Sequence, residues 1–308
     1  MLPLAILRAM RPHQWVKNIF VGAALLFSWA QSGEPDTAHL TSVLLAIVAF
    51  SLGASAIYVI NDIMDVESDR AHPTKCKRPI AAGEMSIPIA LVVSVASVVG
   101  ALALALKIAP DSDHRVAWVV LAYMLMNLLY SVKLKHVVII DAFIIAAGFL
   151  MRLGAGAAAA DLPLSSWIIL CTFFLALFLA FCKRKAEIDL LGENRGGHRK
   201  ILLEYTPVFL DQITVVLAAC TVITYAMWTV QDPTNTAEAV DKAWLGEAQM
   251  VLTVPFVVFG LFRYLLLVQT QKGGGSPTRV LLGGDPIFVA NCLAYVVAVF
   301  VIAKGYLA

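Results

Sequence analysis

The sequence is poor in charged residues and lacks cysteine motifs, which excludes several classes of protein. Only 14% of its 308 residues are charged, and the formal net charge is +2. A soluble domain of this length needs more polar surface than that. No basic tract is interleaved with aromatic residues, so we expect no nucleic-acid partner. The five cysteines form no CxxC pair, which favours buried packing over a disulfide framework or a zinc site.

Long hydrophobic runs take the place of the missing charge, since 60% of the residues are apolar. A helix that crosses a bilayer needs about 20 mainly apolar residues. The runs predict an all-α polytopic membrane protein with nine transmembrane helices and a single integral membrane domain over residues 1–308. The predicted spans lie near 17–32, 39–60, 87–107, 116–132, 137–160, 165–182, 210–230, 248–269 and 286–303.

The basic residues predict the orientation of these spans. Most of the 23 Lys and Arg residues lie in the N-terminal segment and in alternate loops, and basic loops stay on the cytoplasmic side of a membrane. We therefore expect a cytoplasmic N-terminus, an inner (plasma) membrane location and chemistry at the cytoplasmic face. Two of the loops on that side are long and charged, 61–86 and 183–209, and these are the predicted catalytic loops.

Three aspartates follow the second predicted span. Asp62, Asp65 and Asp69 are spaced by three and then four residues, with Asn61 beside them. If the helix continues past the membrane, the three carboxylates line one face. Like charges so placed repel unless a cation lies among them, and Mg²⁺ binds a few carboxylates together with water and phosphate oxygens. We therefore predict a magnesium site here, in preference to a solvated acidic helix end.

Cations accompany both charged loops, as a diphosphate ligand requires. Lys75 and Arg78 come shortly after the aspartates, while Lys183 and Arg184, with the acidic Glu187, directly follow the sixth predicted span. A metal bridges some diphosphate oxygens, and Lys and Arg neutralise others. The alternative for Lys75 and Arg78 is that they only set the membrane topology. The alternative for Lys183, Arg184 and Glu187 is pairing on the helix surface, which stabilises a helix by about 0.3–0.5 kcal/mol per pair.

Two charged residues lie inside the fifth predicted span. Asp141 and Arg152 are eleven residues apart and share one helix face. Charges at this depth usually face a protein interior or a water-filled cavity. We expect both to line the inner cavity, with a structural buried pair as the rival interpretation. At the cytoplasmic ends of other spans, the residues placed to reach a headgroup-level site are Lys17, Asn18, Tyr130 and Lys135.

Nine spans with Asn61-Asp62-x-x-Asp65-x-x-x-Asp69 after the second, and a charged loop after the sixth, resemble the UbiA-type intramembrane prenyltransferase superfamily. The resemblance covers nearly the whole chain and implies a UbiA-like helical bundle. It also implies two motif loops that bind Mg²⁺ and a diphosphate.

The second motif departs from the pattern of members that prenylate aromatic acceptors, which carry a DxxxD-like motif there. This chain has Lys183-Arg184-Lys185-Ala186-Glu187 at that position. The cationic motif resembles the decaprenyl-phosphate phosphoribosyltransferase branch, whose donor, phosphoribosyl pyrophosphate, carries an extra 5-phosphate and needs more cations. The other segments that resemble this branch are Arg11-Pro12-x-Gln14-Trp15-Val16-Lys17-Asn18, Tyr130-Ser131 with Leu134-Lys135, and Glu204-Tyr205-Thr206.

The resemblance implies Mg²⁺-dependent transfer of 5-phosphoribose from phosphoribosyl pyrophosphate to a polyprenyl phosphate such as decaprenyl phosphate, with pyrophosphate released. It also implies a place in cell-wall biosynthesis. The expected partners are the two substrates, the membrane and further copies of the same chain. The alternatives are a prenyltransferase that acts on an aromatic acceptor and a transporter whose aspartates coordinate a coupling cation. The membrane-edge position of the aspartates and the lack of a clear repeat argue against a transporter.

Residue roles follow from the same resemblance. The aspartates would hold Mg²⁺ on the pyrophosphate, and the cations of both loops would bind phosphate oxygens. Glu187 would bind ribose hydroxyls or a second Mg²⁺. The acceptor phosphate is already ionised at neutral pH, so no general base is expected. The candidates for the acceptor phosphate or the 5-phosphate are Lys17, Lys135 and Arg152.

Overall fold

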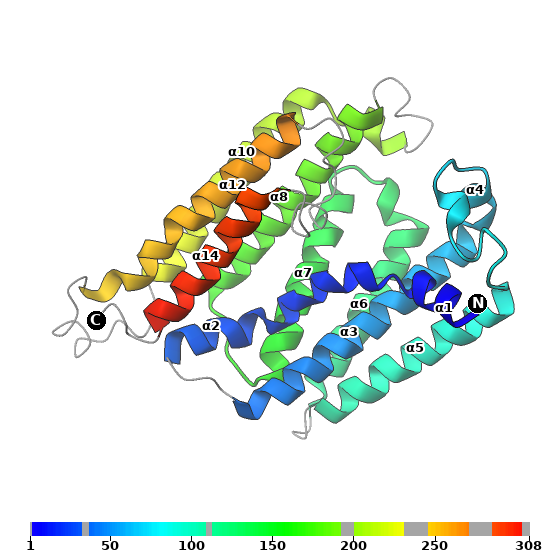
Figure 1. The fold of residues 1–308 in the computed structure, drawn as a ribbon, viewed down its shortest axis with the longest axis horizontal. Helices are drawn as coiled ribbons and strands as arrows, with labels where there is room; N and C mark the ends of the chain where they lie inside the picture. Colours follow the sequence, from blue (N-terminus) through cyan, green and yellow to red (C-terminus); the bar gives the residue numbers. More distant parts are fainter. Residues whose placement is uncertain are drawn as a thin grey trace. The chain divides into compact units, whose positions relative to one another are not determined.

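The structure is a computed structural model that describes residues 2–32, 37–108, 113–191, 200–230, 246–270 and 285–303. Within these ranges the chain forms helices joined by turns, with no strand (Figure 1). The all-α prediction is therefore confirmed. The long helices are α3 (Thr37–Met64), α5 (Ile87–Ile108), α6 (Arg115–Val132), α7 (Ile140–Ala159), α8 (Ser166–Leu191), α10 (Pro207–Val230), α12 (Val254–Thr270) and α14 (Pro286–Ala303). The shorter elements are α1 (Leu2–Met10), η1 (Pro12–Gly22), α2 (Ala23–Ser32), α4 (Val66–Arg70), η2 (Lys75–Lys77), η3 (Leu134–His136), η5 (Lys200–Leu203) and η6 (Gly246–Thr253), where η denotes a 3₁₀-helix.

Seven helices in the described part of the chain are long and apolar enough to cross a membrane. They cover His39–Met64, Ile87–Ile108, Arg115–Val132, Ile140–Ala159, Ser166–Asp189, Pro207–Val230 and Met250–Thr270. A shorter apolar helix covers Pro286–Ile302. The predicted spans from 39–60 to 248–269 each coincide with one of these seven helices. The count of nine, the orientation and the single domain over 1–308 stay predictions.

The segment predicted as the first span, 17–32, is not one α-helix. The chain forms the 3₁₀-helix η1 and continues as α2 from Ala23. A 3₁₀ run of 11 residues is uncommon, and it begins at Pro12, directly after Arg11 in the left-handed conformation (φ 55°). Tertiary contacts hold this backbone. A Cβ atom at Gly156 of α7 would lie 1.7 Å from the Val21 carbonyl oxygen, so the close approach requires glycine there.

The described chain divides into two compact units. The first contains Met1–Leu25, Thr37–Lys133 and Met151–Leu162, and the second contains Leu26–Asp36, Leu134–Leu150 and Pro163–Ala308. The first unit holds the first predicted catalytic loop, and the second unit holds the other. Residues 192–199 of that second loop lie outside the described residues.

Small residues bring the main helices of the first unit together. α5 packs along α3 (Figure 1), and the Ser94 hydroxyl donates a hydrogen bond to the Ala56 carbonyl at 3.2 Å. Such residues let backbones approach closely, as membrane helices commonly do. The buried small residues of α5 are Ala90, Ser94, Ser97, Ala101 and Ala105. Its exposed large apolar residues, which suit a lipid environment, include Leu91, Val92, Val95 and Val99.

Aromatic and aliphatic side chains form the core of the second unit. α8 packs along α10, and the buried cluster includes Phe178, Phe181, Leu210, Leu217 and Tyr264. Phe181 contacts the ring of Tyr205, with centroids 6.1 Å apart. The core therefore extends to the segment between α8 and α10, where Tyr205 lies.

Candidate active site

The first group of site residues lies where α3 ends. The helical geometry is interrupted at Asp65 (φ −93°, ψ 7°), and α4 begins at the next residue. The Asp65 N–H still donates to Asn61 O at 2.9 Å, and the Asp69 N–H donates to Asp65 O at 2.8 Å. These hydrogen bonds keep nearly helical spacing across the interruption, so Asp62 and Asp69 lie close to each other.

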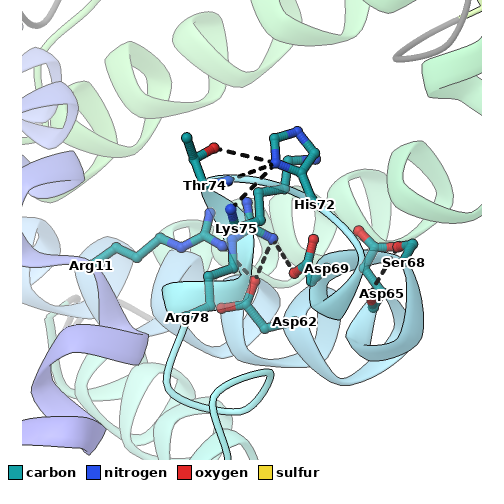
Figure 2. Close-up of polar contacts among 9 residues, drawn as sticks. All are labelled: Arg11, Asp62, Asp65, Ser68, Asp69, His72, Thr74, Lys75 and Arg78. Atoms are coloured by element: carbon teal, nitrogen blue, oxygen red, sulfur yellow. Dashed lines mark hydrogen bonds and ion pairs between the residues drawn. The ribbon is translucent and has the colours of Figure 1, made fainter.

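Arg78 bridges these two carboxylates, and Arg11 adds a contact to one of them. Arg78 Nη1 donates to Asp62 Oδ1 at 3.0 Å and to Asp69 Oδ2 at 2.6 Å (Figure 2). Arg11 Nη2 donates to the same Asp62 oxygen at 2.5 Å. Asp62 and Asp69 are each only 2% exposed. A buried carboxylate needs such a partner, because leaving it unpaired in a low-dielectric site is costly.

Asp65 differs from the other two aspartates. It is half-buried, and its main-chain oxygen accepts a hydrogen bond from the Ser68 hydroxyl at 2.8 Å (Figure 2). Arg78 contacts both Asp62 and Asp69, so these two carboxylates share a partner. The role of Asp65 stays a prediction.

The oxygen donors of this loop fit a magnesium ion. In the described part of the chain, no group of three or more His, Cys, Asp or Glu side chains is already gathered around a metal position. Asn61 Oδ1, however, is buried with no hydrogen-bond partner, which costs about 1–3 kcal/mol. The arginine contacts use only one oxygen of Asp62 and one of Asp69. An amide oxygen beside carboxylates is a donor set that Mg²⁺ accepts.

The turn after α4 carries the next cations. The His72 ring accepts hydrogen bonds at Nδ1 from the backbone N–H groups of Thr74 and Lys75, at 3.2 and 3.3 Å (Figure 2). This contact fixes the start of η2, and the Lys75 side chain is exposed. Sequence reasoning identified Lys75 and Arg78 but missed Arg11 as a partner of Asp62, which lies 51 residues away.

The second group is built around a buried arginine at the end of α8. Arg184 is 1% exposed, and its Nε lies 2.8 Å from Asp141 Oδ2. The same guanidinium pairs with Glu187, one helical turn further on. Lys183 lies 3.8 Å from Glu187 and is more exposed. The structure therefore brings together all three sequence-predicted residues of this loop.

Tyr205 completes this group. Its hydroxyl donates to Asp141 Oδ1 at 2.9 Å and accepts a hydrogen bond from the Ile139 N–H at 2.7 Å. Ile139 has φ 68°, which is a strained conformation for a β-branched residue. Burial raises the pKa of Tyr205, so the hydroxyl stays protonated and remains a donor. The sequence signal for Tyr205 was its place in Glu204-Tyr205-Thr206, but nothing local indicated its partner.

Asp141 and Arg152 each have partners on other segments. Arg152 belongs to a different buried group, where its Nε donates to Asn18 Oδ1 at 2.8 Å and its Nη2 to the Tyr123 hydroxyl at 2.7 Å. Asn18 Nδ2 in turn donates to Ser51 Oγ at 2.9 Å. The group ties η1 to α3, α6 and α7. Eleven residues separate Asp141 from Arg152, and each finds closer partners on other segments.

The remaining candidates are half-buried: Lys17 lies in the middle of η1, Tyr130 lies near the end of α6, and Lys135 lies in η3. Their roles stay predictions.

Comparison with known proteins identifies the family. The model of the UbiA prenyltransferase family matches residues 19–300, which is most of the chain. The chain belongs to the UbiA prenyltransferase family. As the apolar helices also indicate, this UbiA family member is an integral membrane protein.

Two curated relatives narrow the resemblance. The UbiA family member is 37% identical to the decaprenyl-phosphate phosphoribosyltransferase of Corynebacterium glutamicum, over 94% of this chain and 84% of the relative. It is 39% identical to the enzyme of the same name from Mycolicibacterium smegmatis, over 90% of this chain and 86% of the relative. The family and the branch expected from the two motifs are therefore confirmed.

A solved structure confirms the fold. A UbiA homologue from Archaeoglobus fulgidus bound to GPP and Mg²⁺ has a TM-score of 0.70 at 18% identity, over 97% of this chain and 99% of that chain. At this identity the likeness establishes the UbiA-like helical fold alone.

Proposed function

We propose that this UbiA family member is a decaprenyl-phosphate phosphoribosyltransferase. It transfers 5-phosphoribose from phosphoribosyl pyrophosphate to decaprenyl phosphate and releases pyrophosphate. The observation that carries the proposal is the 37% and 39% identity, over most of each chain, to two enzymes of that name. The cationic second motif supports it, because the donor brings a phosphate that an allylic diphosphate lacks.

The first group serves the leaving pyrophosphate. Arg78 fixes the direction of one oxygen of Asp62 and one of Asp69, and Arg11 adds a second contact to Asp62. Mg²⁺, when bound, would neutralise charge that develops on the pyrophosphate. The residues that we assign to hold it are Asn61, Asp62, Asp65 and Asp69.

The second group divides its work between two cations. Arg184 is buried and engaged by Asp141 and Glu187, so its role is to fix the direction of Glu187. Lys183, whose side chain is 44% exposed, is the residue that we assign to a phosphate oxygen. Glu187, 28% exposed, accepts hydrogen bonds from ribose hydroxyls.

The reaction needs no general base from the protein. An oxygen of the lipid phosphate attacks the anomeric carbon, the bond from that carbon to the pyrophosphate oxygen breaks, and the electron pair leaves with pyrophosphate. The attacking oxygen is already ionised at neutral pH. The work of the chain is therefore to place the two phosphorylated substrates and to stabilise the leaving group.

We place the reaction at the cytoplasmic face of the plasma membrane. The support is the distribution of Lys and Arg along the sequence, which puts both motif loops on the cytoplasmic side. The phosphorylated, water-soluble donor reaches the site from the cytosol, and the acceptor reaches it within the bilayer.

The test is a transfer assay on the purified protein in detergent with Mg²⁺. One reaction contains phosphoribosyl pyrophosphate and decaprenyl phosphate, and the other contains a polyprenyl diphosphate and 4-hydroxybenzoate. Mass spectrometry of the lipids should show a phosphoribosylated product in the first reaction only. A prenylated aromatic product in the second, with none in the first, would overturn the proposal.

Substitution of Asp65 tests the metal site in the same assay. Asp65→Asn should lower kcat by at least about 100-fold, as loss of a charge-stabilising group does. The matched control is Glu67→Gln, which removes an exposed acid from the same helical turn and should leave the rate within about twofold. Equal effects of the two substitutions would show that Asp65 has no special role.

A further inference from the structure

A pocket in the first unit is lined by basic residues that the proposed reaction does not yet fully use. Its volume is about 650 Å³, and it lies between the α1–η1 junction and the segment from Thr74 to Pro79. None of the described residues that line it is acidic. The basic residues of this α1–η1 pocket are Arg8, Arg11, His13, Lys75, Lys77 and Arg78.

The carboxylates that pair with the pocket arginines do not line it. Asp62 and Asp69 are 2% exposed, whereas the side chains of Arg11 and Arg78 are 22% and 27% exposed. The arginines therefore turn part of their surface to the pocket while the carboxylates stay buried. Arg8 donates to Glu84 at 2.7 Å, and Glu84 does not line the pocket either.

The lysines add to the positive charge of the pocket. The side chains of Lys75 and Lys77 are exposed, and an ammonium on a flexible stem can turn toward a bound anion. The pKa of His13 is lowered by burial and then by the positive charges of Arg11 and Lys17, so its ring is neutral at neutral pH and adds no charge of its own. Guanidinium and ammonium groups together, without a competing acid on the lining, suit a phosphate group with two negative charges.

The proposed reaction leaves two such groups to be placed. The pyrophosphate of the donor is assigned to the aspartate loop, but the donor's 5-phosphate and the phosphate of the lipid acceptor are both phosphate monoesters. Leu7 and Pro12 add an apolar patch to the pocket lining. Resting on the proposed function, we infer that the α1–η1 pocket is the subsite for a phosphate monoester dianion, with Arg8 and Lys77 as ligands outside the aspartate loop.

The backbone of the pocket supports a binding role for Arg11. Arg11 adopts a left-handed conformation, φ 55° and ψ 61°, immediately before Pro12. Residues other than glycine seldom hold this conformation unless the surroundings fix it. Here it turns the chain from α1 into η1, so that Arg8 and Arg11 line the same pocket.

The test compares two substitutions that break the same ion pair. Arg8→Gln and Glu84→Gln both remove the ion pair between Arg8 and Glu84, but only the first removes a positive charge from the pocket. We expect Arg8→Gln to raise one KM by about tenfold or more, as loss of a charged hydrogen bond does. Glu84→Gln should leave that KM unchanged or lower it. Equal effects of both substitutions would reduce Arg8 to a structural role and overturn the inference.

The substrate whose KM rises shows which of the two phosphate groups the pocket binds. A rise for phosphoribosyl pyrophosphate alone assigns the pocket to the 5-phosphate, and a rise for farnesyl phosphate, used as a short-chain acceptor, assigns it to the lipid phosphate. Lys77→Gln is the second variant, since the exposed side chain can be removed without disturbing the core. It should raise the same KM as Arg8→Gln. Unchanged KM values in both variants contradict the inference.

A binding measurement separates this inference from the proposed function. Titration calorimetry with inorganic phosphate should give a Kd about tenfold weaker for Arg8→Gln and Lys77→Gln than for the wild type and Glu84→Gln. This result would support the pocket even if no phosphoribosyl transfer were detected. Equal phosphate affinities in all four proteins would overturn it even if transfer were observed.

Discussion

The buried group of Asp141, Arg184 and Tyr205 gives a prediction whose magnitude follows from the contacts. Asp141→Asn keeps the shape of the side chain and an acceptor for the Tyr205 hydroxyl, but it removes the charge 2.8 Å from Arg184 Nε. Removing one partner of a buried ion pair costs about 3–5 kcal/mol. Arg184 retains Glu187, so we expect the lower end, about 3 kcal/mol of unfolding free energy.

Tyr205→Phe removes the other contact of Asp141. The lost hydrogen bond runs to a charged acceptor and is worth about 1.5–3 kcal/mol, and the Ile139 N–H loses its acceptor as well. With Asn at position 141 the tyrosine would donate to a neutral amide, and such a bond is about half as strong. The double substitution should therefore cost less than the sum of the two single ones by about 1 kcal/mol.

The assay is equilibrium unfolding in detergent micelles, followed by tryptophan fluorescence, for the wild type, both single variants and the double variant. The control is Asp161→Asn, which breaks the exposed ion pair with Arg115 and should cost less than about 1 kcal/mol. If Asp141→Asn were as mild as the control, the charge of Asp141 would not stabilise the fold through Arg184. If the double variant lost as much unfolding free energy as the two single variants together, the contacts of Asp141 with Arg184 and Tyr205 would be independent of each other.

Two further predictions concern packing and pH. Gly156→Ala should reduce thermal stability and the yield of folded protein, because its Cβ atom would lie 1.7 Å from the Val21 carbonyl oxygen. In the control Gly154→Ala, the Cβ atom would meet no neighbouring segment within 4 Å, so this variant should behave like the wild type in the same detergent melt. A hydrogen bond from Arg263 lowers the pKa of Asp285 from its ordinary value of 3.8, so the stabilisation by this pair is complete above that value and is lost as the pH falls through the lower folded pKa. The difference in melting temperature between wild type and Asp285→Asn should thus be constant from about pH 7 to pH 5 and shrink below about pH 4. A difference that grew on acidification would contradict the expected direction of this pH dependence.

Local spacing predicted the parts of the site that depend on a single helix. Hydrophobic runs located the long helices, and positions three or four residues apart placed Arg184 and Lys183 beside Glu187. The same reasoning brought Asp62 near Asp69, seven residues later. In each case helical geometry alone fixes which side chains meet.

The sequence could not predict contacts that depend on tertiary approach. Asp141 meets Tyr205 from 64 residues away, and Arg152 meets Asn18 from 134 residues away. The interruption of the first predicted span has the same origin. An apolar run with few polar residues predicts a continuous helix, but the approach of η1 to Gly156 is decided by a distant glycine.

Arginine and lysine do different work in the two motif loops, although a count of charges treats them alike. Arg78 and Arg184 bind carboxylates of the chain itself, and a planar guanidinium with five donors suits that task. Lys75, Lys77 and Lys183 keep more of their side chains exposed, so they are available to an incoming phosphate. The basic residues of the sequence therefore overstate the charge that a substrate meets. The arginines mainly fix the direction of the acidic side chains, and the lysines supply most of the mobile positive charge. Loss of Arg78 or Arg184 should accordingly disturb the geometry of the site, whereas loss of Lys75, Lys77 or Lys183 should weaken substrate binding and leave the fold unchanged.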